Sequence, residues 1–298
     1  MRVAAESTAS PSPPTRRVLD ILETLALSSD GAASSEIAQR CAISSSTCAL
    51  VLSELEHHGY VARRDDRRYV LGSGLFAIVA GLRSHYPLLD VGRNALDELR
   101  EATGGACSLS KIESNSLTVL DISGHVADEQ HAVGQRFPID PPFGSVAMAW
   151  KPPESIDRWL LSSMPRLSDK EMEHHRNVLS DIRSRGFGVW VIDDSHPSLR
   201  DRLSAVLDTT DDLRHGTSVV RELTKMLTQM SLKSITHEVE SRLSEAEFIV
   251  VPVFGRDDQP EYQIEIRLNR STRDELTLQR LEAAVEVVTE RLTTHVNR

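Results

Sequence analysis

Residues 34–75 decide the fold of the N-terminal quarter, and they read SSEIAQRCAISSSTCALVLSELEHHGYVARRDDRRYVLGSGL. The residues that follow Ser34 predict a short helix with Ser34 as its N-cap. After a turn over residues 42–45, apolar residues recur every three or four positions, which predicts a second helix that ends at Gly59. Two helices joined by so short a turn are typical of a helix-turn-helix.

Another amphipathic helix precedes this pair, with apolar positions at Val18, Ile21, Leu22 and Leu25. After the pair, residues 61–71 predict a hairpin, the wing, with its reversal at Asp65 and Asp66. Three helices and a hairpin describe a winged helix-turn-helix. In such domains the second helix of the turn enters the major groove, while flanking groups hold phosphates.

The outward side of this second helix and the arginines of the wing are therefore candidate DNA contacts. Hydroxyl groups at the helix N-terminus suit a phosphate, and arginines on the wing release counterions from DNA. The residues predicted to contact DNA are Ser45, Ser46, Thr47, Ala49, Leu50, Ser53, Arg63, Arg64, Arg67 and Arg68. A structural interpretation stays open, in which the hydroxyls only cap the helix and the arginines pair with Asp65 and Asp66.

This stretch resembles the DNA-binding domain of IclR-type transcriptional regulators. The family pattern is a serine- or threonine-led recognition helix, a Leu-x-x-Leu core, Gly-Tyr-Val, a basic wing and Tyr-x-Leu-Gly. The matching residues are Ser46-Thr47, Leu52 and Leu55, Gly59-Tyr60-Val61, Arg63–Arg68 and Tyr69-Val70-Leu71-Gly72. Many members carry arginine where this chain has Leu50, so Leu50 either contacts a thymine methyl group or packs against a neighbouring helix.

Charge is divided unevenly along the 298 residues, whose net charge is −10. The first 72 residues hold 8 basic and 9 acidic side chains, whereas the rest hold 26 and 35. Any contact with nucleic acid is therefore expected to be local to the N-terminal part. The composition, 40% hydrophobic and 26% charged, is that of an ordinary globular protein.

The sequence also excludes several classes of protein. The longest nearly apolar run, residues 75–82, is too short to cross a bilayer, and the N-terminus lacks the apolar core of a signal peptide. The three cysteines form no CxxC motif, which argues against a disulfide framework and a zinc site. We therefore expect a cytoplasmic protein that binds no metal and no membrane.

Residues 1–15 are expected to form a disordered tail before a DNA-binding domain over residues 16–72. Residues 73–86 predict a linker helix with apolar side chains at Leu75, Phe76, Ile78, Val79 and Leu82. A helix so apolar must be covered. Either a second copy covers it, which predicts a homodimer or homotetramer, or the helix packs within its own chain.

The remaining residues, 87–298, predict an α+β domain with an antiparallel sheet. The expected strands are 106–112, 117–123, 187–192, 248–254 and 262–268. Ser168 to Glu171 and Thr272 to Glu275 both indicate helix N-termini, and the last helix would bury Leu281, Val285, Val288 and Leu292. Residues 194–244 are interpreted as a helical insertion.

This larger domain resembles the GAF-like effector-binding domain of the same family. The resemblance implies a small-molecule site at the short helix after residue 143 and in the last strand. The candidate residues are Gly144, Ser145, Met148, Glu265 and Arg267. An inward Arg267 would favour an anionic effector such as an organic acid, but Glu265 could neutralise it. Two alternatives remain, a surface ion pair and a degenerate site without a ligand.

Motifs for catalysis and cofactors are missing from the sequence. It contains no GxxxxGK[ST] phosphate loop and no GxSxG nucleophile elbow. His57-His58 and His174-His175 are neighbours on expected helices, so their side chains diverge. An enzymatic alternative, a methyltransferase that uses its winged helix only for dimerisation, needs a glycine-rich loop that the chain lacks. We therefore expect a regulator rather than an enzyme, with no cofactor.

Overall fold

A computed structural model describes residues 11–124, 133–141, 143–163, 166–192, 232–235, 239–268, 270–273 and 276–297. The chain divides into two compact units, with the boundary between His85 and Tyr86. Each unit encloses its own hydrophobic core.

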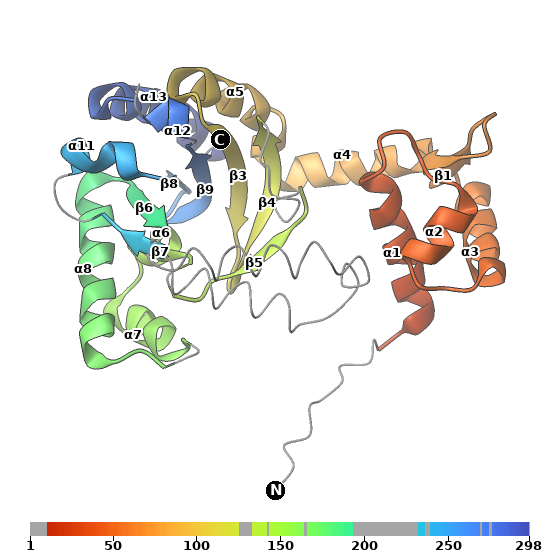
Figure 1. Ribbon diagram of the computed structural model, residues 1–298, viewed down its shortest axis with the longest axis horizontal. Coiled ribbons are helices and arrows are strands. Elements are labelled where there is room, and N and C mark those ends of the chain that lie inside the picture. Colours follow the sequence, from red (N-terminus) through yellow and green to blue (C-terminus); the bar gives the residue numbers. More distant parts are fainter. Residues whose placement is uncertain are drawn as a thin grey trace, which may run out of the picture. The chain divides into compact units, whose positions relative to one another are not determined.

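The N-terminal unit is a winged helix-turn-helix, as predicted (Figure 1). Its elements are α1 (Pro13–Ala26), α2 (Ser34–Arg40), α3 (Ser45–His57), β1 (Val61–Arg63) and β2 (Tyr69–Leu71). The two strands pair antiparallel, with Arg63 opposite Tyr69. The predicted inner faces of the helices form one core, with buried side chains at Ile21, Leu25, Ile37, Ala38, Cys41, Cys48, Leu52, Leu55 and Val61.

Two helix N-termini differ from the prediction. α1 begins at Pro13, inside the segment 1–15 expected as a tail, because proline suits the first turn of a helix, where N–H groups have no partner. α2 includes Ser34, so the predicted Ser34 cap is wrong. The N-cap is Ala33, whose N–H donates to Glu36 Oε2 at 2.9 Å.

Glycines bring the end of α3 close to the exit of the wing. Gly59 has a φ of +73°, which suits the left-handed end of a helix. A β-carbon on Gly72 would lie 2.2 Å from the carbonyl oxygen of Gly59, and Gly74 N–H donates to that same oxygen at 2.8 Å. A side chain at position 72 would collide with the backbone of Gly59, which explains why the Tyr-x-Leu-Gly segment ends in glycine.

The unit ends with a 3-10 turn (Ser73–Leu75) and α4 (Phe76–His85). No residue of α4 is buried, and Phe76 leaves 73% of its surface exposed. Ile78, Val79 and Leu82 are also exposed. The described residues of the single chain therefore leave the apolar surface of this linker helix uncovered.

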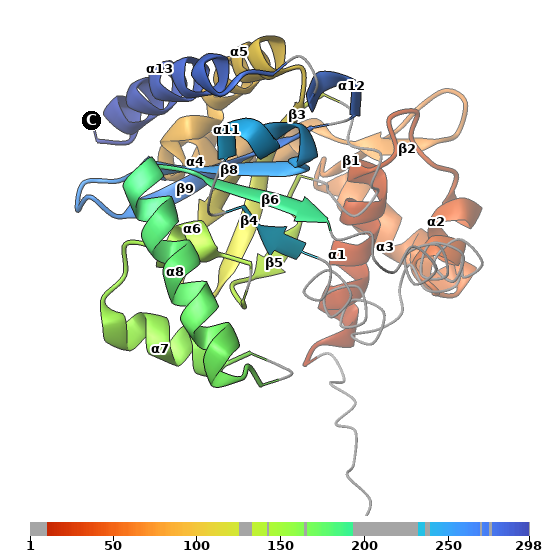
Figure 2. The ribbon, with the colours of Figure 1, turned by 60° about the vertical axis from the view of Figure 1, so that its left-hand side comes forward.

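The C-terminal unit is an α+β domain built on an antiparallel sheet, which confirms the predicted fold (Figures 1 and 2). The strand order among the described residues is β5-β4-β3-β9-β8-β6-β7. The strands are β3 (Ala106–Ile112), β4 (Ser116–Ser123), β5 (Arg136–Pro138), β6 (Gly188–Ile192), β7 (Leu232–Ser234), β8 (Phe248–Phe254) and β9 (Pro260–Arg267). The two short edge strands, β5 and β7, are absent from the sequence prediction.

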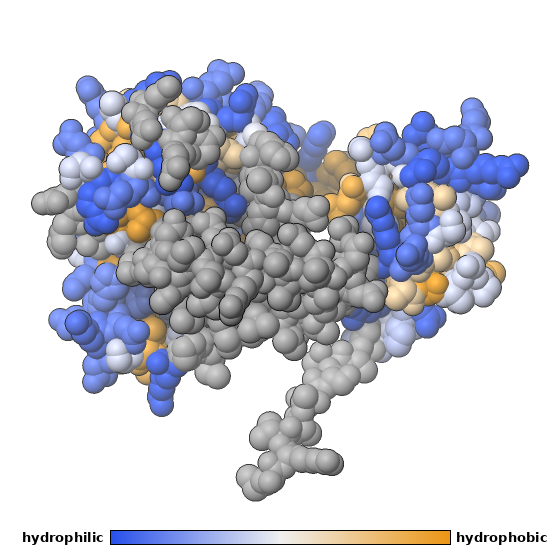
Figure 3. Space-filling view, in the orientation of Figure 1, coloured by the Kyte–Doolittle hydropathy of each residue, from blue (hydrophilic) through white to orange (hydrophobic). Residues whose placement is uncertain are grey.

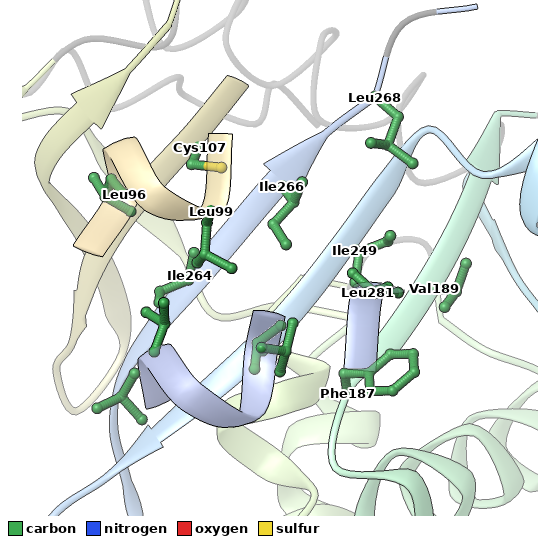
Figure 4. Packing of buried hydrophobic residues seen from close by; sticks show 14 of the residues in the cluster. Leu96, Leu99, Cys107, Phe187, Val189, Ile249, Ile264, Ile266, Leu268 and Leu281 are labelled. Carbon is green, nitrogen blue, oxygen red and sulfur yellow. The ribbon is translucent and has the colours of Figure 1, made fainter. Parts of the chain in front are cut away.

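One face of the sheet is covered by α5 (Gly92–Thr103) and α13 (Leu278–Val296). Figure 4 shows the core between them, where Leu96 and Leu99 from α5 and Leu281 from α13 meet Ile249, Ile264 and Ile266 from the central strands. The four apolar positions predicted for the last helix, Leu281, Val285, Val288 and Leu292, are all buried.

The opposite face carries α6 (Ser145–Met148), α7 (Pro153–Leu161) and α8 (Asp169–Arg185). Their core is made by Val146, Trp159, Leu160, Val178, Leu179, Ile182 and Trp190, against which Phe248 and Val250 of the sheet pack. The Ser168 cap of α8 is confirmed, because Ser168 N–H and Oγ both donate to Glu171 Oε2.

The predicted cap at Thr272 is wrong. Residues 270–273 form a short helix of their own, α12 (Arg270–Arg273), and α13 is capped by Thr277, whose Oγ1 accepts from Arg280 N–H at 3.3 Å. The helix starts where its own first N–H groups find an acceptor.

Most of the insertion expected over residues 194–244 lies outside the described residues. Its described end contains β7, α11 (Val239–Arg242) and a 3-10 turn (Leu243–Glu245). Within the described part of the chain, no helix has the length and apolar character that crossing a bilayer requires.

Candidate functional site

The outward face of α3 is exposed. Its exposed residues include Ser45, Ser46, Ala49, Leu50 and Ser53, while Thr47 is half-buried. Leu50 leaves 74% of its surface exposed, so within the described residues of the single chain it is not packed against a neighbouring helix. The predicted groove-facing side chains are thus brought together on one accessible surface.

Hydroxyl groups form a small network at the N-terminus of α3. Ser44 Oγ accepts from Thr47 N–H at 3.1 Å and lies 3.0 Å from Ser46 Oγ and 2.8 Å from Thr47 Oγ1. These hydroxyls cap the helix in the free chain. A phosphate oxygen at this end would meet the N-terminal N–H groups and the positive end of the helix dipole.

The wing closes through hydrogen bonds between its own backbone groups. Arg64 N–H donates to Arg68 O at 2.8 Å, and Arg67 N–H donates to Arg64 O at 2.9 Å. Arg67 has a φ of +67°, and its exposed side chain forms no hydrogen bond or ion pair with the residues that the structure describes. Arg67 is therefore available to a phosphate.

Arg68 is held differently from the other wing arginines. Its guanidinium donates to Gly31 O, at 2.9 Å from Nη2 and 3.2 Å from Nε, and to Glu36 Oε2 at 3.0 Å. Gly31 precedes α2 and Glu36 lies in its first turn, so Arg68 connects the wing to the helices. Its geometry suits positioning of the wing better than contact with DNA.

Arg63 and Arg64 are exposed and only loosely engaged. The Arg63 guanidinium carbon lies 5.7 Å from the centre of the Tyr69 ring. Arg64 Nη2 lies 3.7 Å from Asp66 Oδ2, and its Nη1 donates to Asp30 O at 3.3 Å. An exposed ion pair and an exposed cation–π contact are both weak, so the two side chains can exchange these partners for phosphates. Figure 3 shows the hydrophilic surface of the wing, in blue, beside a more apolar surface over the helices.

The cysteines are core residues. Burial raises the pKa of the Cys41 and Cys48 thiols, and it raises that of Cys107 to about 12. Cys107 faces the α5 and α13 side of the sheet, among Leu96, Leu99 and Ile266 (Figure 4). Cys107 therefore does not belong to the face that carries the candidate effector residues.

Polar side chains gather on the face of the sheet opposite that core. Glu265 lies opposite Ser108, and Gln263 lies opposite Ser110, so these residues and Arg267 point to the same side. The intervening side chains of Tyr262, Ile264 and Ile266 are buried in the core on the other face. We call Ser108, Ser110, Gln263, Glu265 and Arg267 the polar row.

α6 lies on this same face. Phe248 and Val250, which pair with Arg267 and Glu265, pack into the cluster that contains Val146 of α6. The structure therefore brings the predicted short-helix residues and the predicted strand residues to one side of the sheet. Ser145 is buried and Met148 is half-buried, while Gly144 adopts a φ of +80° where a β-carbon would lie 2.5 Å from Ile139.

Within the polar row, charge is partly compensated. Arg267 Nη2 lies 3.4 Å from Glu265 Oε1, and its guanidinium carbon lies 4.8 Å from the centre of the Phe248 ring. Gln263 is only 7% exposed, and its Oε1 accepts no hydrogen bond from the described residues. Since buried polar atoms are normally hydrogen-bonded, Gln263 Oε1 is an acceptor that a ligand or water would satisfy. The sequence analysis did not include Gln263 among the candidate residues, although Gln263 lies two positions before Glu265 in the same expected strand.

A family model described as the IclR helix-turn-helix domain matches residues 14–65. The N-terminal unit carries an IclR helix-turn-helix domain. The predicted resemblance is thereby confirmed for the α1, α2 and α3 segment and the start of the wing. No curated protein matches the chain.

Solved IclR-type structures resemble nearly the whole chain. An IclR transcriptional regulator from Alicyclobacillus acidocaldarius is 19% identical, with 96% of this chain and 99% of that one covered and a TM-score of 0.51. An IclR homologue from Microbacterium hydrocarbonoxydans, complexed with 4-hydroxybenzoate, is 16% identical, with 95% and 98% covered and a TM-score of 0.57. IclR of Thermotoga maritima is 15% identical, with 94% and 98% covered and a TM-score of 0.53. At these identities the likeness establishes a shared fold.

The IclR fold thus extends over both units of this chain. The helix-turn-helix domain is assigned by its own family model, and the C-terminal antiparallel sheet with its helices matches the fold of the solved structures. The candidate contacts on α3 lie within the matched segment, as do Arg63 and Arg64, whereas Arg67 and Arg68 follow it by two and three residues.

Proposed function

We propose that this chain is a transcriptional regulator that binds operator DNA through its IclR helix-turn-helix domain and responds to a small-molecule effector. The observation that carries the proposal is the exposed outward face of α3 next to a wing whose Arg67 side chain is exposed. Helix-turn-helix domains place such a helix in the major groove. The proposed contacts are Ser45, Ser46, Thr47, Ala49, Leu50, Ser53, Arg63, Arg64 and Arg67, with Arg68 positioning the wing.

The experiment is a titration of fluorescent duplex DNA from the surroundings of the gene with the full-length protein. We expect saturable binding that weakens linearly on a double logarithmic plot as salt is raised, because phosphate contacts release counterions. A random duplex of equal length separates specific from non-specific binding. Absence of binding in dilute buffer would overturn the proposal.

We propose that the regulator works as a homodimer or homotetramer. The apolar side chains of α4, with Phe76 most exposed, support this because a second copy would cover them. A two-fold pair of recognition helices suits two half-sites one DNA turn apart. Light scattering during size exclusion, with and without DNA, measures the oligomeric state.

We propose that the effector is a small organic acid that binds on the polar row beside α6. The proposed residues are Gly144, Ser145, Met148, Glu265 and Arg267, with Gln263 as an added hydrogen-bonding group. Support comes from Arg267, from the unsatisfied Gln263 Oε1 and from the relative that holds 4-hydroxybenzoate. Such a ligand alters DNA affinity only through different affinities for two conformations.

Addition of 4-hydroxybenzoate and simple aliphatic carboxylates should raise the unfolding temperature of the full chain and shift its DNA affinity. The Glu265–Arg267 ion pair supports a second candidate, a DNA-binding regulator without an effector. In that case no carboxylate changes either quantity. In both candidates the protein acts by binding rather than catalysis, in the cytoplasm where operator DNA lies.

A further inference from the structure

In the first two turns of α3 the outward face carries apolar and hydroxyl side chains and neither lysine nor arginine. The sequence from Ser45 to His57 contains neither lysine nor arginine, and Glu54 and Glu56 are exposed acids. The largest outward side chain in the first two turns is Leu50, which is 74% exposed. Apart from a phosphate contact at its N-terminus, this helix therefore offers DNA no lysine or arginine charge, and its outward face can contribute only hydroxyl groups, shape and apolar contact.

Position distinguishes Leu50 from other exposed leucines. Exposure alone marks no site, since isolated apolar side chains are common on protein surfaces, and Leu27 at the end of α1 is 75% exposed. Leu50 lies in the N-terminal half of the helix, the part that reaches base edges in this class of domain. Ser46 and Ser53, one turn away on either side, are too small to shield it.

The chemistry of the major groove restricts what such a face can recognise. Guanine is read mainly by arginine or lysine and adenine by asparagine or glutamine, and α3 exposes none of these side chains. The C5-methyl group of thymine is the group in the groove that apolar side chains contact.

We propose that Leu50 contacts thymine methyl groups and, with Ala49, makes this regulator prefer operators with thymine at the base pairs they face. The inference rests on the proposed DNA-binding function. It assigns sequence preference to an apolar side chain and assigns affinity for the phosphates to the wing and to the N-terminus of α3.

The experiment begins with selection of bound duplexes from a random pool by the full-length protein. Each thymine of the selected site is then replaced in turn by deoxyuridine, which removes only the methyl group. At one or two positions in each half-site, we expect binding to weaken roughly four-fold for each methyl group removed. Leu50→Ala should bind the thymine and uracil duplexes equally at the position that Leu50 faces.

The matched control is Leu27→Ala, which removes an equally exposed leucine outside α3 and should keep the full response to uracil. Because Leu50 is exposed, Leu50→Ala should unfold at the parent temperature. If selection recovers no DNA, the inference and the proposed function both fail. If DNA is bound but uracil has no effect at any position, or Leu50→Ala keeps the parent response, only the thymine contact is overturned.

A second variant tests the same contact by gain of preference. Arginine binds guanine through two hydrogen bonds in the major groove. Selection with Leu50→Arg should therefore recover guanine where the parent recovers thymine. Recovery of the parent sequence by Leu50→Arg would show that residue 50 does not face the bases.

Discussion

The guanidinium of Arg68 lies 3.0 Å from Glu36 Oε2 and also donates to Gly31 O, which ties the wing to the start of α2. We expect Arg68→Ala to lower the free energy of unfolding of the N-terminal unit by about 1 kcal/mol. Hydrogen bonds from a charged group to a backbone carbonyl stabilise the fold, but the exposure of this pair limits their contribution.

The two units can be followed separately during urea unfolding. All three tryptophans, Trp150, Trp159 and Trp190, belong to the C-terminal unit. Arg68→Ala should therefore shift part of the helical circular dichroism transition and leave the tryptophan transition in place. Arg67→Ala is the matched control, because the Arg67 side chain forms no hydrogen bond or ion pair with the described residues. Equal shifts for both variants would show that the contacts of Arg68 with Gly31 and Glu36 do not stabilise the N-terminal unit.

The same two arginines should differ in their contributions to DNA binding. Each phosphate contact contributes about 0.9 to the slope of log affinity against log salt. Arg67→Ala should reduce that slope by about this amount, since its side chain is exposed. Arg68→Ala should change it less, because its guanidinium is held by Gly31 and Glu36. Anisotropy titrations at several salt concentrations measure both slopes, and a larger effect from Arg68 would reverse the assignment.

Local patterns made the N-terminal unit predictable. Helical spacing predicted the apolar faces that pack into its core. The distinct role of Arg68 was not predictable, because its partner Glu36 lies 32 residues earlier and the pair forms only when the wing folds back. Similar side chains in a row, such as the wing arginines, acquire different roles from tertiary contacts.

In the candidate effector site, too, the sequence predicted local features but not those that depend on tertiary contacts. The family resemblance pointed to Glu265 and Arg267 in the last strand, and both lie on the same side of β9. The sequence could not predict the edge strands β5 and β7, which are three residues long and lack a periodic pattern of their own. The sequence also could not predict that Gln263 Oε1 is buried without a hydrogen-bond partner, because its burial depends on elements remote in sequence.

An acidic residue on α4 should dissociate the proposed oligomer. Phe76→Asp places a charge in the apolar surface of the helix, where a second copy would have to bury it without a partner. We expect a monomer by light scattering. Leu161→Asp, at a 54% exposed leucine of α7, is the control and should keep the parent mass. A monomeric parent, or an unchanged mass for Phe76→Asp, would exclude α4 as the interface.

The thiols should resist reaction with thiol reagents until the chain unfolds. Cys41, Cys48 and Cys107 are free and buried, and burial raises the pKa of each, so the reactive thiolate is scarce near neutral pH. A chromogenic disulfide reagent at pH 8 should detect almost no thiol in the native protein and three per chain in denaturant. Fast reaction of one thiol in the native protein would indicate local opening of its core.

Stability of the C-terminal unit should depend on pH through His175. This side chain packs against Trp159, with ring centres 6.1 Å apart, and its pKa is lowered by burial and further by His174, against an opposing effect of Glu171. In the unfolded chain the histidine pKa is about 6.5. As pH falls below that value, the unfolded chain binds a proton that folded His175 still resists, so the free energy of unfolding decreases.

The free energy of unfolding should keep decreasing until the pH reaches the lower pKa of folded His175. Above the pKa of His175 in the unfolded chain, this side chain contributes no pH dependence. Urea unfolding followed by tryptophan fluorescence between pH 7.5 and 5.5 measures the effect. His175→Gln should lose much of the dependence because glutamine does not titrate, whereas His174→Gln, at the exposed neighbour, should retain most of it. An identical pH dependence in His175→Gln and the parent would assign the proton to another group.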